Sequence, residues 1–420
     1  GDIQPCVALG KGLADAGYEV RVVTMANFEP MVRQHGLEFF LMEGDAEALV
    51  KDMLRQMDGK GLQFVRMYRG ILRTFGAISR SYHKAFSAEA LRDSDAMLSQ
   101  LPGGFYSYDL AEALQIPYIA LSVIPQEPTR AWPVPVLPTR ASLGQWYNRQ
   151  TFRFTNLVGW QPFRAPINRF RAELGLKPAS FLWGNTLRIG RERVPVIQGF
   201  SEQVVPTPPE WGEHIHTTGY WILDEPDWQP SPELRAFLDA GDPPVAIGFG
   251  SMPVPDPDST TRLILEALES SGQRAILLSG WAQLGRQALP ETVFPLDYAP
   301  YPWLFPRMAA IIHHGGSGTT GLALRSGVPS LVIPFTADQP FWGERTHALG
   351  VGPAALPFST LTADDLAAAL RTMLSDVTMQ QRAAQLRDAM AAEQGIQTAV
   401  AIIRDYLDRW DSPGKGNARG

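Results

Sequence analysis

Residues 309–342 constrain the fold of this chain more than any other stretch. An apolar run, 309–312, ends at His313 and His314, and a turn rich in glycine, 315–318, follows it. The residues after the turn have the spacing of a helix, so the stretch predicts a strand, a glycine turn and a helix in that order. The first turn of such a helix has unpaired N–H groups and the positive end of the helix dipole. Because glycine lets a bound group approach the backbone closely, an anion such as a diphosphate fits there.

A second apolar run, 330–335, leads to Asp338 and Gln339. Open parallel sheets bind ligands at the carboxyl ends of their strands. We therefore expect the carboxylate and the amide to lie at the same sheet edge as the glycine turn.

Three interpretations of this stretch compete. Gly316, Gly318 and Gly321 match the dinucleotide fingerprint of oxidoreductases, and Asp338 follows where a ribose-binding acid is expected. The two histidines before the turn and the hydroxyl of Thr319 instead favour a ligand with exposed phosphate oxygens. A buried strand–helix–strand unit without a ligand is the third interpretation, and the concentration of polar side chains argues against it.

The block His-His-Gly-Gly-Ser-Gly-Thr-Thr at 313–320 also carries a family resemblance, supported by Gly327-Val328-Pro329, Asp338-Gln339 and Phe341-Trp342. It resembles the donor-site signature of nucleotide-sugar glycosyltransferases of the GT-B fold. Within that fold it resembles the sterol-glucosyltransferase-like and bacterial antibiotic-glycosyltransferase group. The resemblance extends over nearly the whole chain and implies an α/β fold of two doubly wound αβα domains that face a cleft.

Length and composition agree with two soluble domains. The 420 residues exceed what one core usually organises, and 45% of them are hydrophobic. Cys6 is the single cysteine, and the sequence has neither a membrane-spanning apolar run nor a signal peptide, so we expect a cytoplasmic protein. Residues 1–200 carry a net charge of +5 and residues 201–420 one of −11, and neither value suits a nucleic-acid binder.

The pattern along the chain predicts an N-terminal acceptor-binding domain at 1–205 and a linker rich in proline and tryptophan at 206–232. A C-terminal nucleotide-sugar donor domain should follow at 233–394, with strands at 245–249, 275–279, 309–312 and 330–333. The resemblance implies that a final helix, 395–410, returns to the first domain, and we expect a disordered tail at 411–420.

The beginning of the chain is unusual. Gly1 and Asp2 run directly into a predicted helix, 7–16, which a strand at 19–24 follows. A doubly wound domain has a strand before such a helix, and that strand is missing here. The family that the chain resembles has this strand, followed by a Gly-x-Arg-Gly-Asp turn. Only Gly1 and Asp2 of that turn are present here. We expect a segment of the record to be missing, the alternative being an inactive fragment.

Further along the first half, strands are expected at 38–42, 95–99 and 118–122. The five prolines within residues 125–140 predict an extended loop of the kind that lines acceptor sites. Two separate helices are predicted after this loop, at 143–154 and 162–174.

The resemblance assigns donor-site roles by position. It implies that His314 contacts the diphosphate with Thr319 beside it, that Gly316 and Gly318 permit close backbone approach, and that Ser251 and Ser317 belong to the same set. Asp338 and Gln339 match the pair that reads the sugar hydroxyls.

Two departures from the family pattern concern the nucleotide. Tyr298 stands where plant relatives have a tryptophan that stacks on the base, and Leu322 stands where they have a ribose-binding glutamate. Trp281 is a second candidate for base stacking, although a packing role fits it equally. The nucleoside of the donor therefore stays open.

The expected reaction needs a base for the acceptor hydroxyl and stabilisation of the departing diphosphate. The resemblance implies that Asp2 is the base, and an N-cap of the first helix is its structural alternative. Asp256-Pro257-Asp258 and Asp93-Ser94-Asp95 match an Asp-x-Asp metal pattern that occurs often by chance, so we predict neither a metal nor another cofactor.

Two basic stretches without acidic residues, 59–88 and 128–172, lie in the first half. At helical spacing, the first has an apolar face flanked by arginines such as Arg66, Arg69 and Arg73, which predicts contact with an anionic membrane surface. An ordinary helix packed on the core is the alternative.

The sequence thus predicts an inverting glycosyltransferase that moves a hexosyl group, glucose by resemblance, from a UDP-sugar to a hydroxyl of a lipophilic small molecule. The alternatives are an NAD(P)-dependent oxidoreductase and an inactive nucleotide-sugar-binding protein.

Overall fold

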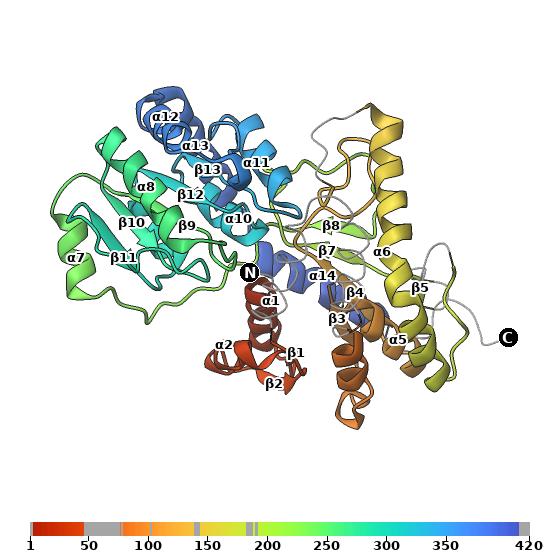
Figure 1. Cartoon of the computed structure of the whole chain (residues 1–420). Helices are drawn as coiled ribbons and strands as arrows, with labels where there is room; N and C mark the ends of the chain where they lie inside the picture. Colours follow the sequence, from red (N-terminus) through yellow and green to blue (C-terminus); the bar gives the residue numbers. More distant parts are fainter. Residues whose placement is uncertain are drawn as a thin grey trace.

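The computed structural model describes residues 3–45, 76, 79–100, 103–137, 143–181, 188–189 and 192–410. Figure 1 shows two α/β lobes, with the C-terminal lobe on the left and the N-terminal lobe on the right. Residues of both lobes line one large cavity between them. The predicted α/β fold with two domains and parallel sheets is confirmed.

The C-terminal domain is built on a five-stranded sheet with the order β11-β10-β9-β12-β13, and every neighbouring pair is parallel. The strands are β9 Val245–Gly248, β10 Ala275–Leu278, β11 Val293–Leu296, β12 Ala310–His313 and β13 Ser330–Val332. Strand β11 was not predicted, because Pro295 interrupts its pattern. Since β11 is an edge strand, a residue without an N–H is tolerated there.

Alternate residues of each central strand enter cores on opposite faces of this sheet. In β9, Val245 and Ile247 pack with α8 (Pro257–Ser271) and α12 (Ala363–Ser375), whereas Ala246 packs in the second core with Leu234 of α7 (Pro232–Asp239). A parallel sheet covered on both faces needs such apolar strands. The remaining helices of this domain are α9 Tyr301–Leu304, α10 Ser317–Arg325, α11 Gln339–Ala348 and α13 Val377–Ala391.

The described strands of the N-terminal domain form two separate parallel sheets and one short hairpin. One sheet pairs β1 with β2, and the other has the order β3-β4-β7-β8. Both β1 and β3 line the large cavity. The strands are β1 Arg21–Thr24, β2 Glu38–Leu41, β3 Met97–Ser99, β4 Tyr118–Ser122, β7 Val196–Gln198 and β8 Ile215–Thr217, with the hairpin β5 Arg188–Ile189 and β6 Glu192–Arg193. Strand β8 extends this domain into the stretch predicted as the linker.

Helices α1 (Ile3–Asp15), α2 (Glu29–Gln34) and α5 (Gly104–Leu114) accompany these strands. The final helix, α14 (Gly395–Trp410), packs its buried Ala399 and Ile403 into the same core as Leu9 of α1. None of the helices within the described ranges is long and apolar enough to cross a membrane.

The prediction of two helices after the proline-rich loop was wrong, because a single helix, α6 (Gln145–Glu173), spans both. Pro162 and Pro166 lie inside it, and each lacks the N–H that would bond one turn back. Buried aromatic residues hold its second half against α5, among them Trp160, Phe163 and Phe170.

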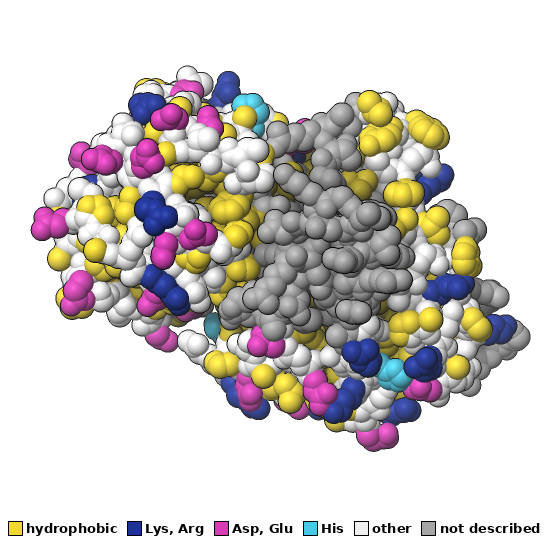
Figure 2. Space-filling view, in the orientation of Figure 1, with side chains coloured by type: hydrophobic (Ala, Val, Ile, Leu, Met, Phe, Trp, Pro, Cys, Tyr) yellow, Lys and Arg dark blue, Asp and Glu magenta, His cyan; other side chains and the backbone are white. Residues whose placement is uncertain are grey.

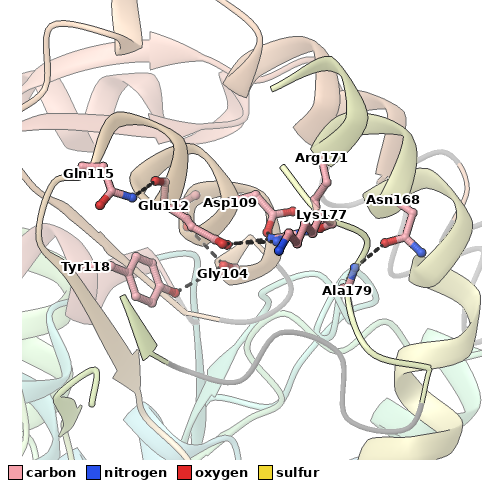
Figure 3. Close-up of polar contacts among 10 residues, drawn as sticks. Gly104, Asp109, Glu112, Gln115, Tyr118, Asn168, Arg171, Lys177 and Ala179 are labelled. Atoms are coloured by element: carbon pink, nitrogen blue, oxygen red, sulfur yellow. Dashed lines mark hydrogen bonds and ion pairs between the residues drawn. The ribbon is translucent and has the colours of Figure 1, made fainter. Parts of the chain in front are cut away.

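A buried ion pair also fixes the end of α6. The Arg171 guanidinium contacts the carboxylates of Asp109 and Glu112 on α5, and its Nε donates to the Lys177 carbonyl at 2.6 Å (Figure 3). The Arg171 and Asp109 side chains are 6% and 0% exposed. Removing either partner would leave a buried charge uncompensated, so this contact holds α6 in one position.

Candidate active site

A cavity of about 1610 Å³ lies between the domains. On the C-terminal side it is lined by the turns that follow β9, β10, β12 and β13, where parallel sheets bind ligands. On the N-terminal side it is lined by the start of α1 and by residues around β1 and β3. Every predicted donor-site residue within the described ranges lies on this cavity, namely Ser251, Trp281, Tyr298, His314, Gly316, Ser317, Gly318, Thr319, Asp338 and Gln339.

The glycine turn between β12 and α10 has the conformation that its sequence predicts. Gly315 has φ of +88°, and a Cβ there would lie 2.4 Å from the Val332 side chain. A Cβ on Gly316 would lie 2.5 Å from Nε2 of His314. The backbone can therefore pass beside the histidine only without side chains, and the amides at the start of α10 border the cavity.

His313 and His314 differ in their surroundings although both are buried. Nδ1 of His313 accepts a hydrogen bond from the Gly315 amide at 3.0 Å, and this ring does not line the cavity. His314 is 6% exposed and lines it. Burial lowers the pKa of each ring to about 3, with the neighbouring histidine adding to the effect at His314. His314 is thus a neutral imidazole at neutral pH, able to donate one N–H.

Nδ1 of His314 is buried and has no hydrogen-bond partner among the described residues. A buried polar atom without a partner costs roughly 1–3 kcal/mol. Only a hydrogen-bond partner for Nδ1 itself would offset that cost.

Some hydroxyl side chains of the site line the cavity, and others form hydrogen bonds to the backbone. Ser251 and Thr319 line the cavity, whereas Thr320 donates to the Gly316 carbonyl one turn earlier, at 2.9 Å. Ser317 donates to the backbone carbonyl of Val123, which follows β4 in the other domain. Its hydroxyl therefore joins the two domains at the edge of the site, a contact that the sequence did not reveal.

The Asp338–Gln339 pair is held rigidly at the end of β13. Oε1 of Gln339 accepts from the amides of Phe335 and Thr336 at 2.7 and 3.1 Å, and Oδ2 of Asp338 accepts from the indole N–H of Trp342 at 2.7 Å. Ala337 has φ of +55°, a left-handed conformation that is strained for a residue with a side chain. Strain of this kind persists only where the surrounding contacts impose it, as those of Gln339 and Trp342 do here.

Trp342 was quoted only as part of the family signature, and the structure gives it a specific role. Its side chain is fully buried, and its ring packs against Phe341 and against Phe200 of the N-terminal domain, with centroids 5.2 and 6.3 Å apart. The spacing from Asp338 to Trp342 is i to i+4, which would have indicated the contact once the start of α11 was known.

Trp281, Tyr298 and Leu322 also line the cavity. Tyr298 is 51% exposed, and its hydroxyl donates to the carboxylate of Glu225, which also lines the cavity. Partial burial and the Glu225 carboxylate raise the pKa of Tyr298. Glu225 comes from the stretch predicted as linker, and nothing in its local sequence indicated this position.

Asp2 lies outside the described residues. The first residues after it, Ile3 and Gln4, begin α1 and line the cavity that His314 also lines. The stretch 59–75, with Arg66, Arg69 and Arg73, lies outside the described residues as well.

The Asp-x-Asp pairs have other contacts. Asp256 accepts from the Ser259 amide at 3.0 Å and caps α8, and Asp93 pairs with Arg21 at 3.1 Å. Within the part of the chain that the structure describes, no three His, Cys, Asp or Glu residues are grouped so as to hold a metal ion.

Comparison with known proteins agrees with this geometry. Residues 1–133 match the glycosyltransferase family 28 N-terminal domain, and residues 273–404 match the C-terminal domain of the erythromycin biosynthesis protein CIII-like family. A sterol 3-beta-glucosyltransferase of Arabidopsis thaliana is 35% identical over 414 residues, which are 97% of this chain and 64% of the relative. One of Emericella nidulans is 36% identical over 421 residues, 96% of this chain and 29% of the relative. The chain thus spans less than two thirds of the length of these relatives.

Among solved structures, the calicheamicin glycosyltransferase CalG4 superimposes with a TM-score of 0.65 at 19% identity, covering 98% of this chain and 96% of that one. The glycosyltransferase VinC, solved in complex with DTDP, gives 0.63 at 18% identity and covers 97% and 96%. At these sequence identities the superpositions show that the fold is shared, and no more.

Two α/β domains with parallel sheets on either side of one cavity give this chain the GT-B fold of these solved glycosyltransferases. In sequence it is similar over nearly its whole length to sterol 3-beta-glucosyltransferases, and its two ends match domains of glycosyltransferase family 28 and of the erythromycin biosynthesis protein CIII-like family.

Proposed function

We propose that the protein transfers a hexosyl group, glucose in the first instance, from a UDP-sugar to a hydroxyl of a lipophilic small molecule such as a sterol, a terpenoid or a polyketide. The observation that carries this proposal is the buried, neutral His314, whose ring lines the cavity between Gly250 and Gly316 and has an unpartnered Nδ1 among the described residues. The named activity of the sterol 3-beta-glucosyltransferase relatives supports both the sugar and the class of acceptor.

In this proposal the diphosphate binds the amides at the start of α10, the His314 ring and the hydroxyl of Thr319. Gly316, Gly318 and Ser251 border the same anion. Asp338 and Gln339 bind sugar hydroxyls, while Trp281 and Tyr298 contact the nucleoside. The preorganised donors around the diphosphate stabilise the charge that develops as it departs.

Asp2 is the proposed base. It removes the proton from the acceptor hydroxyl as that oxygen forms a bond to the anomeric carbon. The bond from this carbon to the diphosphate breaks at the same time, and UDP leaves with the electron pair. A single displacement inverts the anomeric configuration. No metal and no further cofactor takes part.

Two alternative functions can be distinguished from this proposal by experiment. An NAD(P)-dependent oxidoreductase would use the same glycines, and an inactive protein would bind the nucleotide sugar without transferring it. Tryptophan-quenching titrations distinguish the first, because UDP and not NAD should bind. Release of UDP only when a lipophilic acceptor is present distinguishes the second, since an inactive binder releases none.

We also propose a peripheral contact with an anionic membrane surface in the cytoplasm, where a lipophilic acceptor would be concentrated. The basic, acid-free stretches 59–88 and 128–172 support this location. Only the second lies largely within the described residues.

A further inference from the structure

The first half of α6 leaves a row of large apolar side chains uncovered. Trp146, Phe154 and Val158 are 76%, 63% and 46% exposed, and Leu143 just before the helix is 74% exposed. Phe154 and Val158 are one helical turn apart, and the buried Asn148 and Phe152 lie on the other side of this half of the helix. Most large apolar side chains of a folded protein are at least partly covered, so three exposed ones on half of one helix, with a fourth just before it, point to a partner surface.

Arginines lie between these apolar residues. Arg149 and Arg153 are exposed and lie beside Trp146, three and seven residues further along the helix. Residues 128–172 contain no Asp or Glu, so no acidic residue of this stretch neutralises them. Figure 2 shows hydrophobic side chains with Lys or Arg beside them along the edge of the molecule that α6 forms. We call Trp146, Arg149, Arg153, Phe154 and Val158 the α6 outer face.

The chemistry of this face fits a lipid surface better than a protein partner. Tryptophan and phenylalanine favour the boundary between lipid head groups and acyl chains, and arginine beside them binds anionic head groups. Arg171, at the other end of α6, takes no part, because Asp109 and Glu112 already pair with it.

The buried side of the same half-helix holds the proline-rich loop, predicted to line the acceptor site. Nδ2 of Asn148 donates to the Arg130 carbonyl at 2.9 Å, and Oγ1 of Thr151 accepts from the Val134 amide at 2.8 Å. Between these two anchors, Trp132 packs against Phe341 of α11, with ring centroids 6.1 Å apart. The buried side of α6 thus holds the loop whose Trp132 contacts the helix that starts at Gln339.

From these observations we propose that the α6 outer face docks the protein on an anionic bilayer, with Trp146 and Phe154 inserted at the head-group boundary and Arg149 and Arg153 on lipid phosphates. This specifies the membrane contact of the proposed function and rests on it for its purpose, which is delivery of a lipophilic acceptor. The docking itself does not require catalysis.

The test is co-sedimentation of the intact protein with mixed phosphatidylcholine–phosphatidylglycerol vesicles and with phosphatidylcholine alone. Binding should occur on the mixed vesicles and weaken in high salt. Arg149→Gln with Arg153→Gln should lower the partition coefficient by roughly thirtyfold, since each arginine near an anionic surface contributes about a fivefold factor. The matched control replaces Arg235 and Arg262, which lie in the C-terminal domain, with Gln and should leave partitioning unchanged.

A second variant reports the docking site itself. Vesicles with brominated acyl chains should quench the emission of Trp146, and Trp146→Phe should lose this quenching while still sedimenting with vesicles. Trp303→Phe, in the C-terminal domain, should keep it. Absence of binding to anionic vesicles at low salt, or quenching that survives in Trp146→Phe, would overturn the proposal. So would self-association in sedimentation velocity that Phe154→Ser abolishes, because the face would then bind a second copy.

UDP-sugar binding and transfer to an acceptor dissolved without vesicles are measured in parallel. If the wild-type protein neither binds UDP-sugar nor transfers the sugar, the proposed function is refuted, but the result on membrane docking still holds.

Discussion

Replacing Trp342 with phenylalanine separates the positioning of Asp338 from the packing around it. The indole N–H donates to Oδ2 of Asp338 at 2.7 Å, whereas the ring packs on Phe341 and Phe200. Phenylalanine keeps an aromatic ring at this position and removes the donor, together with the part of the indole that a single ring does not fill. The variant should therefore fold, with a stability cost below the roughly 3–5 kcal/mol of truncating a buried aromatic residue to alanine.

The expected effect on transfer follows from the bond that is lost. A hydrogen bond to a charged group contributes roughly 1.5–3 kcal/mol. If that energy holds Asp338 against the sugar, kcat/KM for UDP-glucose should fall by roughly ten- to hundredfold. The affinity for UDP alone should stay unchanged, because UDP carries no hexose for Asp338 to bind.

Kinetics with UDP-glucose and calorimetry with UDP measure the two quantities, and Trp303→Phe is the matched control. Trp303 packs against Trp228 and does not line the cavity. The reasoning is refuted if Trp342→Phe transfers glucose at the wild-type rate, or if it loses affinity for UDP and UDP-glucose equally.

Three further predictions concern the histidines and the base. His314→Ala should retain the fold and lose roughly tenfold or more in turnover, as measured by UDP release, and unchanged turnover would contradict the donor assignment. Because burial lowers the pKa of His313 and His314 to about 3, the unfolded chain binds more protons than the folded one below the usual histidine pKa. The free energy of unfolding is therefore at its full value above about pH 6.5 and falls as the pH drops, by roughly 2 kcal/mol per ring at pH 5. Urea titrations over this pH range should show a smaller fall for His314→Gln than for the wild type. The same fall in both proteins would contradict the prediction. Asp2→Asn should reduce transfer far more than the melting temperature, whereas a lower melting temperature with transfer preserved would identify Asp2 as a helix cap.

The sequence predicted the strand, glycine turn and helix of the proposed donor site because the information for them is local. Residues 313–320 hold the turn, the histidines and the start of α10 within one short stretch, and glycines that have no room for a Cβ stand where the backbone needs them. The parallel strands of the C-terminal sheet were predictable for a related reason, since strands buried on both faces are apolar throughout.

The contacts that complete the site join distant parts of the chain and leave no local pattern. Ser317 binds a carbonyl 194 residues away, and Tyr298 binds Glu225, 73 residues away. Proline residues account for two wrong predictions of secondary structure, the missed strand β11 and the division of α6 into two helices. Edge position and aromatic packing compensate there for the missing N–H groups, and both depend on tertiary structure.

The most direct test of the proposed function is to incubate the protein with UDP-glucose and a mixed panel of sterols, carotenoids and polyketides, and to analyse the products by mass spectrometry and NMR. The account predicts a hexosyl conjugate of a lipophilic hydroxyl compound, formed in equal amount with UDP and inverted at the anomeric carbon. Hydrolysis of UDP-glucose without a conjugate, a conjugate with retained configuration, or binding of NAD in place of UDP would contradict it.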